Sequence, residues 1–389
     1  MAAVDIVVLA ILVIAVIIGV MRGLLASVGS LVGLAVGGLA AYWAVPLVNA
    51  AIPDAAWRGA AVLAVAVGLL LIGSAVGSAI GMALRRGVDK TKLRGLERLL
   101  GGAVSLTVAA LAVSLAGQSL AATGMPFVAS SVSSSRILTA IQDLTPRPLA
   151  ATMAQLRGAA EEGIPRLGQL LAPQLAPSIP DVALDEPALT AAAQSVARVS
   201  GVAFACGITA SGSGFVVAPD RVMTNAHVVA GVDRPVVELP GREAREGRVV
   251  YFDPVDDIAV VAVDGLDATP LDVVPTLGVG SEAVVQGYPY GGPFTTGAAR
   301  VLSVGMADVP DVYDESSSAR EVYALAAQVR PGNSGGPLLS TTGQVAGLVF
   351  ARAEGDDDLG YAMTPTEMSP VVDRLAELDA AVASGTCSG

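Results

Sequence analysis

The sequence predicts two structural classes in one chain: an all-α transmembrane bundle of four helices, then an all-β domain of two barrels. Apolar residues make up 53% of the 389 residues and charged residues only 15%, whereas a soluble domain usually carries about 25% charged residues. The apolar excess lies before residue 123. From residue 196 the chain changes to short Val-rich runs separated by turn residues, which is typical of a barrel or sandwich.

Four apolar stretches are each close to or above the roughly 18–20 residues that cross a bilayer as a helix. They are residues 4–20, 24–48, 60–82 and 99–122. A cleaved signal peptide is the alternative for the first stretch, but that stretch has no basic start and three further spans follow. We therefore expect a four-span domain over 1–123, a linker over 124–195 and the all-β domain over 196–389.

Basic residues are concentrated in the short loop between the third and fourth stretches. They are Arg85, Arg86, Lys90, Lys92, Arg94 and Arg98. Loops this rich in Lys and Arg stay on the cytoplasmic side of a membrane. Because the number of spans is even, both termini then lie outside, and the chain after residue 123 lies in the periplasm or its equivalent. The sequence thus predicts a multi-pass protein of the cytoplasmic membrane, with the lipid bilayer as a partner.

Glycine recurs every four residues in two of the spans, at Gly33 and Gly37 and again at Gly73, Gly77 and Gly81. Such faces let membrane helices pack closely. Glycine is also simply common in membrane helices, so the pattern has two interpretations. No ionisable residue lies in the middle of a span, which argues against a transporter with a proton or ion relay.

The linker combines helix-like stretches with repeated prolines, which end or kink helices. We expect it to contain short helices and to be partly mobile. Arg147, Arg157 and Arg166 lie in it and would then be open to proteolytic cleavage.

Charge and metal-ligand content exclude two classes of function for the all-β part. Residues 196–389 contain 25 acidic and 11 basic residues, a net charge of −14, which is unsuited to nucleic acid. His227 is the only histidine, and Cys206 and Cys387 lack metal-ligand spacing, so we expect neither a metal nor a cofactor. The two cysteines are either separate buried thiols or a disulfide in an oxidising compartment.

Three motifs follow one another in the all-β part. His227 follows Thr-Asn-Ala, Asp257 precedes Ile-Ala-Val, and Ser334 lies within Pro-Gly-Asn-Ser-Gly-Gly-Pro. A serine hydroxyl needs an adjacent base to become a nucleophile, and an imidazole oriented by a carboxylate supplies that base. Asp256 is the rival carboxylate. The N–H groups of Gly332 and Ser334 are the expected oxyanion hole.

The order His, Asp, Ser and the preceding Gly-Ser-Gly-Phe resemble the trypsin-like, HtrA-type bacterial serine proteases over nearly all of 196–380. This resemblance implies a chymotrypsin-like double β-barrel and a serine endopeptidase that cleaves protein and peptide substrates of the cell envelope through an acyl-enzyme. In that family the residue immediately before Ile-Ala-Val is the carboxylate, which favours Asp257. Self-cleavage in the linker is a further expectation.

Residues 1–125 resemble the colicin V production family in the stretches Gly-Val-Met-Arg-Gly-Leu-Leu and Leu-Arg-Gly-Leu-Glu-Arg-Leu-Leu. Four spans with one protease domain, and no PDZ domain after residue 380, resemble the acid-resistance periplasmic serine proteases of mycobacteria and their relatives. That resemblance implies a disulfide between Cys206 and Cys387 and a role in acid or oxidative envelope stress.

The family pattern also indicates the residues of the substrate pocket. Gln328, six positions before Ser334, would lie at its base, and because it is not an acid we expect no simple preference for Arg or Lys. Phe350, Ala351 and Arg352 would line one wall, with Gly360 and Tyr361 near another. We expect the Arg352 side chain to be solvated.

A non-catalytic membrane scaffold or sensor, using the protease fold for binding, is the alternative function. It predicts a damaged triad or oxyanion loop. The sequence shows neither.

Overall fold

The structure is a computed structural model. It describes residues 3–51, 55–88, 93–121, 132, 135–146, 149, 152, 165–171, 178–203 and 208–387. The chain divides into two compact units, Ala3–Ser114 and Leu115–Gly389, and each is described by itself.

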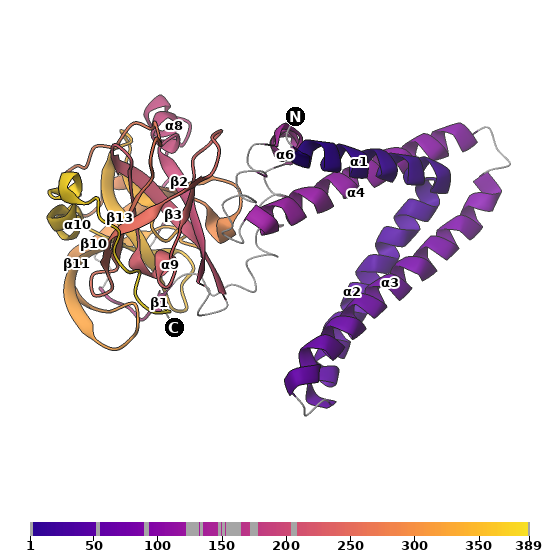
Figure 1. Ribbon diagram of the computed structural model, residues 1–389, viewed down its shortest axis with the longest axis horizontal. Helices are drawn as coiled ribbons and strands as arrows, with labels where there is room; N and C mark the ends of the chain where they lie inside the picture. Colours follow the sequence, from indigo (N-terminus) through magenta and orange to yellow (C-terminus); the bar gives the residue numbers. More distant parts are fainter. Residues whose placement is uncertain are drawn as a thin grey trace. The chain divides into compact units, whose positions relative to one another are not determined.

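Four long helices form the N-terminal part (Figure 1). They are α1 (Ala3–Arg22), α2 (Leu24–Ala51), α3 (Ala55–Val88) and α4 (Arg94–Ala121). Each contains an apolar segment of at least 18 residues, long enough to cross a membrane. The four predicted spans are therefore confirmed as helices of suitable length and composition. Gly23 separates α1 from α2 with a φ of 81°, a left-handed conformation that suits glycine.

The spaced glycines form the contact between α2 and α3, which run side by side in Figure 1. A side-chain carbon at Gly33 would overlap the carbonyl oxygen of Gly73, and one at Gly77 would overlap that of Gly29. Beside them, the hydroxyls of Ser30 and Ser74 are 2.7 Å apart. The packing interpretation of the glycine pattern is thus the one that the structure confirms.

Arg85 and Glu97 join the helix ends at one end of this bundle. Arg85 Nη1 donates to the carbonyls of Met21 (2.6 Å) and Arg22 (2.5 Å) in the last turn of α1. Arg85 Nε lies 3.4 Å from Glu97 Oε2, and the N–H of Leu25 donates to Glu97 Oε1. A cation at carbonyl ends and an anion at N–H ends both suit the helix dipoles. Lys90 and Lys92 of the basic loop lie outside the described residues.

The linker contains α6 (Arg136–Leu144), α8 (Pro187–Ala193) and a short strand, β1 (Arg166–Leu167). β1 pairs in parallel with β13 (Val345–Ala353): Arg352 N–H donates to Pro165 and Glu354 N–H to Leu167. Because its backbone is paired, Arg166 does not lie in the open, mobile segment that the sequence predicts, and that expectation is wrong for this residue. Arg147 and Arg157 lie outside the described residues.

Seven antiparallel strands form the first sheet, in the order β6-β5-β2-β3-β4-β8-β7. They are β2 (Val196–Ala203), β3 (Ile208–Ala218), β4 (Arg221–Thr224), β5 (Val236–Glu238), β6 (Arg245–Glu246), β7 (Arg248–Asp253) and β8 (Ile258–Ala262). A short helix, α9 (Ala226–Val229), follows β4.

The second sheet closes on itself, because six of its strands pair as a ring in the order β9-β10-β11-β14-β13-β12 and β12 returns to β9. β1 adds a seventh strand. The remaining strands are β9 (Glu282–Gly287), β10 (Thr295–Pro310), β11 (Ser317–Ala326), β12 (Pro337–Ser340) and β14 (Leu359–Met363), followed by α10 (Pro365–Val372). Two 3-10 turns, Pro289–Gly291 and Leu375–Glu377, complete the elements.

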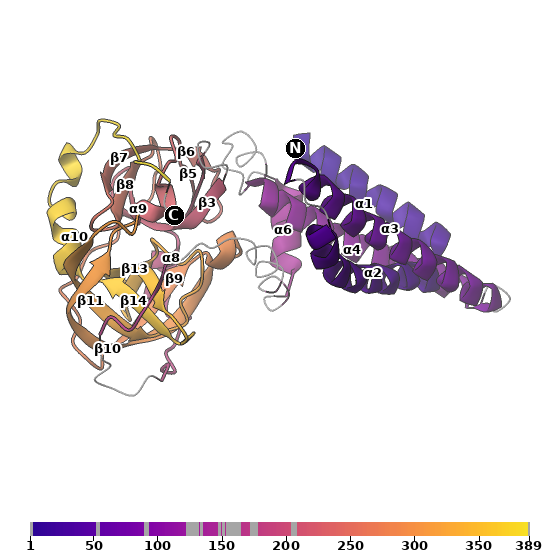
Figure 2. The same cartoon turned by 90° about the horizontal axis from the view of Figure 1, so that it is seen from below.

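One apolar cluster joins the two sheets, which Figure 2 shows as separate groups of strands. Phe215 and Met223 of the first sheet share it with Leu302 and Phe350 of the second, and all four are fully buried. Burial of such a side chain stabilises the fold by about 1.5–3 kcal/mol. The predicted all-β double barrel is confirmed, and its central core fixes the two sheets against each other.

Candidate active site

His227 lies in α9, at the end of the first sheet. β4 ends at Thr224, whose hydroxyl donates to the carbonyl of Ser213 (2.7 Å). Asn225 then precedes the helix in an extended conformation. The backbone N–H of His227 donates to Asp257 Oδ1 (2.9 Å). This bond fixes the helix start, and with it the imidazole, to the residue just before β8.

Asp257 contacts the imidazole through both carboxylate oxygens. Nδ1 of His227 lies 2.8 Å from Oδ2 and 3.0 Å from Oδ1. Asp257 has a φ of 54°, an uncommon left-handed conformation that Asp tolerates. Its carbonyl accepts a hydrogen bond from Asn225 Nδ2 (2.9 Å), which holds the turn. The carboxylate beside the imidazole is therefore that of Asp257.

Asp256, the rival carboxylate, has different surroundings. Its backbone N–H donates to Asp253 Oδ1 (3.0 Å). Burial and then the nearby Asp253 carboxylate raise the pKa of Asp256 above its ordinary value. No hydrogen bond joins its side chain to His227 among the described residues.

Ser334 is fully buried in the turn before β12. Glycines at 332 and 335 have φ of 91° and 81°, so this turn requires glycine on both sides of the serine. The N–H groups of Asn333 and Gly336 donate within the same loop, to the carbonyls of Arg330 and Asn333, and that of Gly335 donates to the carbonyl of Val349 in β13. Those of Gly332 and Ser334 donate no hydrogen bond to any described residue, as the prediction of an oxyanion hole requires.

The structure brings the serine turn against β3 and against the residue that precedes α9. Ser213 N–H donates to the carbonyl of Ser334 (2.8 Å). A side-chain carbon at Gly335 would lie 3.2 Å from the N–H nitrogen of Asn225. Ser334 Oγ and His227 Nε2 are both buried, and in the described part of the chain neither has a hydrogen-bond partner. In substrate-free sites this bond is often long and tightens when substrate binds.

Ser213 links the parts of the site, a role that the sequence analysis missed. Its hydroxyl donates to the carbonyl of Gly332 (2.6 Å) and accepts from the N–H of Tyr288 (2.9 Å). Tyr288 is buried, and burial raises its pKa, so its hydroxyl stays neutral and donates to Val196. The Gly-Ser-Gly motif is the only sequence signal for Ser213.

The predicted pocket residues differ in exposure. Phe350 and Ala351 are buried, whereas Gln328 is exposed and its amide donates to Asp358 (3.0 Å). Arg352 is only 17% exposed and lies 2.9 Å from Asp357, so the expectation of a solvated side chain is wrong. Tyr361 is buried and its hydroxyl accepts from the N–H of Leu170 in the linker.

Cys387 is half-buried near the end of the described chain, and Cys206 lies outside the described residues. The predicted pairing of the two thus remains a prediction.

Known proteins match both parts of the chain. The family model described as colicin V production protein matches residues 4–146, and the trypsin-like peptidase domain matches 212–348. Serine protease Rv3671c of Mycobacterium tuberculosis is 34% identical over 316 residues, which cover 79% of this chain and 79% of the relative. The chain belongs to the trypsin-like serine protease family.

This serine protease also resembles a solved structure, described as the active form of the Rv3671c protease from M. tuberculosis. The two share 37% identity with a TM-score of 0.53, over 56% of this chain and 97% of that one. A putative serine protease, HhoA of Synechocystis, is 33% identical over 178 residues, 43% of this chain and 44% of its own length.

Proposed function

We propose that this serine protease hydrolyses peptide bonds of envelope proteins with Ser334 as nucleophile, His227 as general base and Asp257 as the orienting carboxylate. The observation that supports this most is the two-oxygen contact between Asp257 and Nδ1 of His227. A carboxylate beside Nδ1 favours the tautomer that carries the ring proton on Nδ1. Nε2 is left as the acceptor for a hydroxyl proton.

In the proposed reaction, Nε2 of His227 takes the proton of Ser334 as Oγ attacks the peptide carbonyl. The N–H groups of Gly332 and Ser334 bind the oxyanion that forms. The imidazolium then protonates the leaving amine, and an acyl-enzyme remains on Oγ. Water, activated by the same imidazole, hydrolyses this ester and returns the site to its starting state.

The protease domain lies on the periplasmic side of the membrane in this proposal, with both termini outside. The basic loop between α3 and α4 supports this orientation. A relative from Ectopseudomonas mendocina, described as a probable periplasmic serine endoprotease, is 33% identical over 180 residues. Acid or oxidative stress of the envelope is the setting that we propose, on the family resemblance, with self-cleavage in the linker over 124–195.

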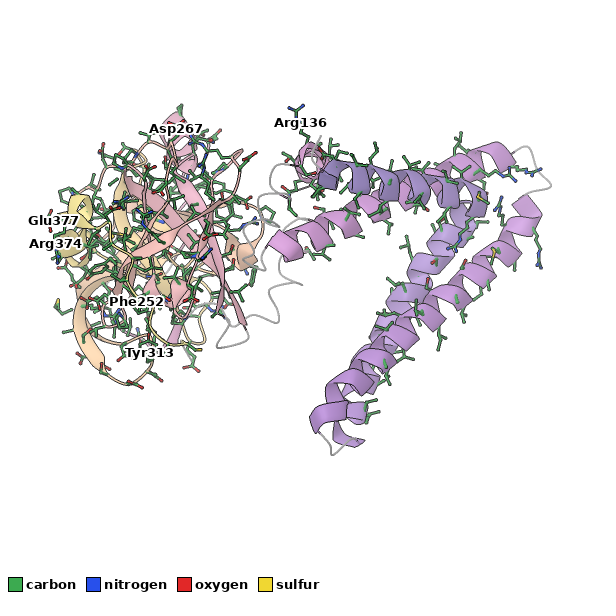
Figure 3. All side chains as sticks on the ribbon, in the orientation of Figure 1. Arg136, Phe252, Asp267, Tyr313, Arg374 and Glu377 are labelled. Carbon is green, nitrogen blue, oxygen red and sulfur yellow. The ribbon has the colours of Figure 1, made fainter. Side chains whose placement is uncertain are left out.

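A disulfide between Cys206 and Cys387 is also part of the proposal. The tail before Cys387 is held in place: Gly231 N–H donates to Ser384, and Thr386 N–H donates to the hydroxyl of Tyr313. A side-chain carbon at Gly385 would overlap the Tyr313 hydroxyl and the Phe252 ring, two residues that Figure 3 labels on the protease domain. Intact mass measured with and without alkylation, before reduction, tests the bridge, since a bridged protein takes up no alkyl group.

Hydrolysis of a fluorogenic peptide by the purified full chain tests the catalytic assignment. Ser334→Ala is expected to reduce kcat by about 10⁵–10⁶-fold while leaving the thermal midpoint near that of wild type. Ser369→Ala, which removes an exposed hydroxyl on α10, is the matched control and should keep full activity. Wild-type rates in the folded Ser334→Ala protein would contradict the assignment.

A further inference from the structure

The two expected oxyanion-hole donors, the N–H groups of Gly332 and Ser334, lie in peptide groups that are held in different ways. Both peptide groups are trans, so the C=O and the N–H of each point in opposite directions, and a bond that fixes the carbonyl also aims the N–H. The N–H of Ser334 shares its peptide group with the Asn333 carbonyl. That carbonyl accepts from the N–H of Gly336 (2.9 Å) within the same turn. The serine turn therefore aims this donor by itself.

The Gly332 donor instead depends on a separate loop between β9 and β10, residues 288–292, which we call the Tyr290 loop. The peptide group of this donor includes the Pro331 carbonyl, which accepts from the N–H of Tyr290 (2.5 Å). The loop also packs tightly on Gly332, because a side-chain carbon there would lie 2.4 Å from the Tyr288 carbonyl oxygen and 2.7 Å from the Tyr290 nitrogen. The position of the Tyr290 loop thus sets the direction of the Gly332 N–H.

The Tyr290 loop has a conformation that needs support from its surroundings. Tyr290 has a φ of 57°, which is rare for a bulky side chain and persists where neighbouring contacts fix it. Arg198 of β2 makes such a contact at the next residue, since its Nη1 donates to the carbonyl of Gly291 (3.2 Å). Its Nη2 pairs with the carboxylate of Glu238 in β5, which lies directly opposite Arg198 in the sheet. The guanidinium is 12% exposed and is held between the loop and the carboxylate.

We propose that Arg198 is a positioning residue of the oxyanion hole: its bond to the Tyr290 loop keeps the Gly332 N–H aimed at the developing oxyanion. The proposal rests on the proposed function, in which Ser334 is the nucleophile. Removal of the guanidinium releases the loop at Gly291, and the strained backbone relaxes. The peptide group before Gly332 then loses its fixed direction, whereas the contact between His227 and its carboxylate is unaffected.

The kinetic consequence is a loss of transition-state binding with ground-state binding preserved. In hydrolysis of a fluorogenic peptide by the purified full chain, Arg198→Met should reduce kcat by about 10–100-fold and leave KM within about threefold, since removing an oxyanion donor altogether costs about 10²–10³-fold. Arg198→Lys keeps a cation with N–H donors between Gly291 and Glu238, and it should recover at least about a third of the wild-type kcat.

A peptide aldehyde separates an effect on the oxyanion hole from a general loss of structure. When Ser334 Oγ adds to the aldehyde, a C–O bond forms, the carbonyl electron pair moves onto oxygen, and the hydroxyl proton passes to His227. The resulting oxyanion needs the Gly332 N–H, whereas the corresponding peptide alcohol binds without forming one. Arg198→Met should raise the inhibition constant of the aldehyde by about 10–100-fold and change that of the alcohol by less than about threefold.

Arg221→Met is the matched control for the loss of a half-buried arginine. Arg221 lies on β4 of the same sheet and is 14% exposed. Like Arg198, it bonds one carbonyl, that of Leu378 (2.8 Å), and one carboxylate, that of Asp379 (3.4 Å). Its removal should leave kcat and both inhibition constants unchanged.

Three outcomes would overturn the proposal. The first is a folded Arg198→Met protein with wild-type kcat, and the second is an equal loss of affinity for the aldehyde and the alcohol. Arg198→Gln is a second neutral variant, and failure of both variants to fold is the third, since the role would then be structural alone. A wild type that hydrolyses no peptide and binds the aldehyde no more tightly than the alcohol would instead refute the proposed function.

Discussion

Asp257 and Asp256 are adjacent in the sequence, yet only Asp257 bonds the imidazole. We expect Asp257→Asn to lower kcat by about 10⁴-fold, because an amide favours the wrong tautomer of His227. Asp256→Asn is the matched control, expected to stay within about threefold of wild type. Steady-state kinetics on both variants checks this. A larger loss in Asp256→Asn than in Asp257→Asn would reverse the assignment.

The same control variant carries a prediction about pH. Burial raises the pKa of Asp256, so the fold disfavours its ionised form. Above pH 3.8, the ordinary pKa, the Asp256 carboxyl ionises more readily in the unfolded chain than in the folded one, which lowers the free energy of unfolding. Asp256→Asn should therefore be equally or more stable than wild type at pH 7, and the gain should vanish as the pH falls below about 3.8. Thermal unfolding midpoints of both proteins, measured from about pH 3 to about pH 8, provide the check.

Ser213 supports the loop before β12, which carries the proposed oxyanion hole, by its hydrogen bond to Gly332. Ser213→Ala leaves the carbonyl of Gly332 and the N–H of Tyr288 without their partner, which should cost about 1–3 kcal/mol. It should also reduce kcat by about 10–100-fold with a smaller change in KM. Ser211→Ala on the same strand is the control, because Ser211 Oγ is buried without a hydrogen-bond partner in the described part of the chain. Equal kinetics for the two variants would contradict a supporting role.

At the scale of single residues, the sequence predicts those site residues that lie in short local motifs. His227, Asp257 and Ser334 each lie in a short pattern of neighbours, and the Asp257 carboxylate lies 2.8 Å from Nδ1 of His227. Ser213 acts through a contact with a residue distant in sequence, since Gly332 lies 119 positions further along the chain. Periodicity and spacing carry no information about such contacts, so only the fold could reveal them.

At the scale of elements, the glycine face determines how closely α2 and α3 approach. Gly33→Leu would force the helices apart, since a side-chain carbon there already overlaps the Gly73 carbonyl. We expect it to destabilise the bundle by about 1–3 kcal/mol. Gly68→Leu is the matched control on α3, because a side-chain carbon at Gly68 would meet no atom within 4 Å. Thermal midpoints of the full chain in detergent compare them, and equal midpoints would contradict this packing.

The strands and helices themselves were largely predictable, and β1 was not. The spans follow from long apolar runs and the barrels from short Val-rich runs, both of which are local signals. β1 is two residues long, and its pairing partner β13 lies almost 190 positions further on. So short a strand forms only because β13 offers free backbone groups with which it can pair. The proline-rich sequence around β1 does not indicate that β13 is its pairing partner.

At the scale of the whole molecule, membrane orientation can be tested with the chain's own lysines. Lys90 and Lys92 are the only two, and both lie in the basic loop. A membrane-impermeant succinimidyl ester should modify neither in intact cells and both after permeabilisation, as read by peptide mass spectrometry. Arg374→Lys adds an exposed lysine to the protease domain and should be modified in intact cells. Modification of Lys90 or Lys92 in intact cells would invert the orientation.

Covalent labelling by a fluorophosphonate tests the catalytic assignment most directly, because the reagent reacts with a serine only where a neighbouring base activates it. The purified full chain should gain one adduct, located by peptide mass spectrometry on Ser334. His227→Ala should slow its formation by at least about 100-fold. A folded wild-type protein that forms no adduct, or forms it on another serine, would contradict the account.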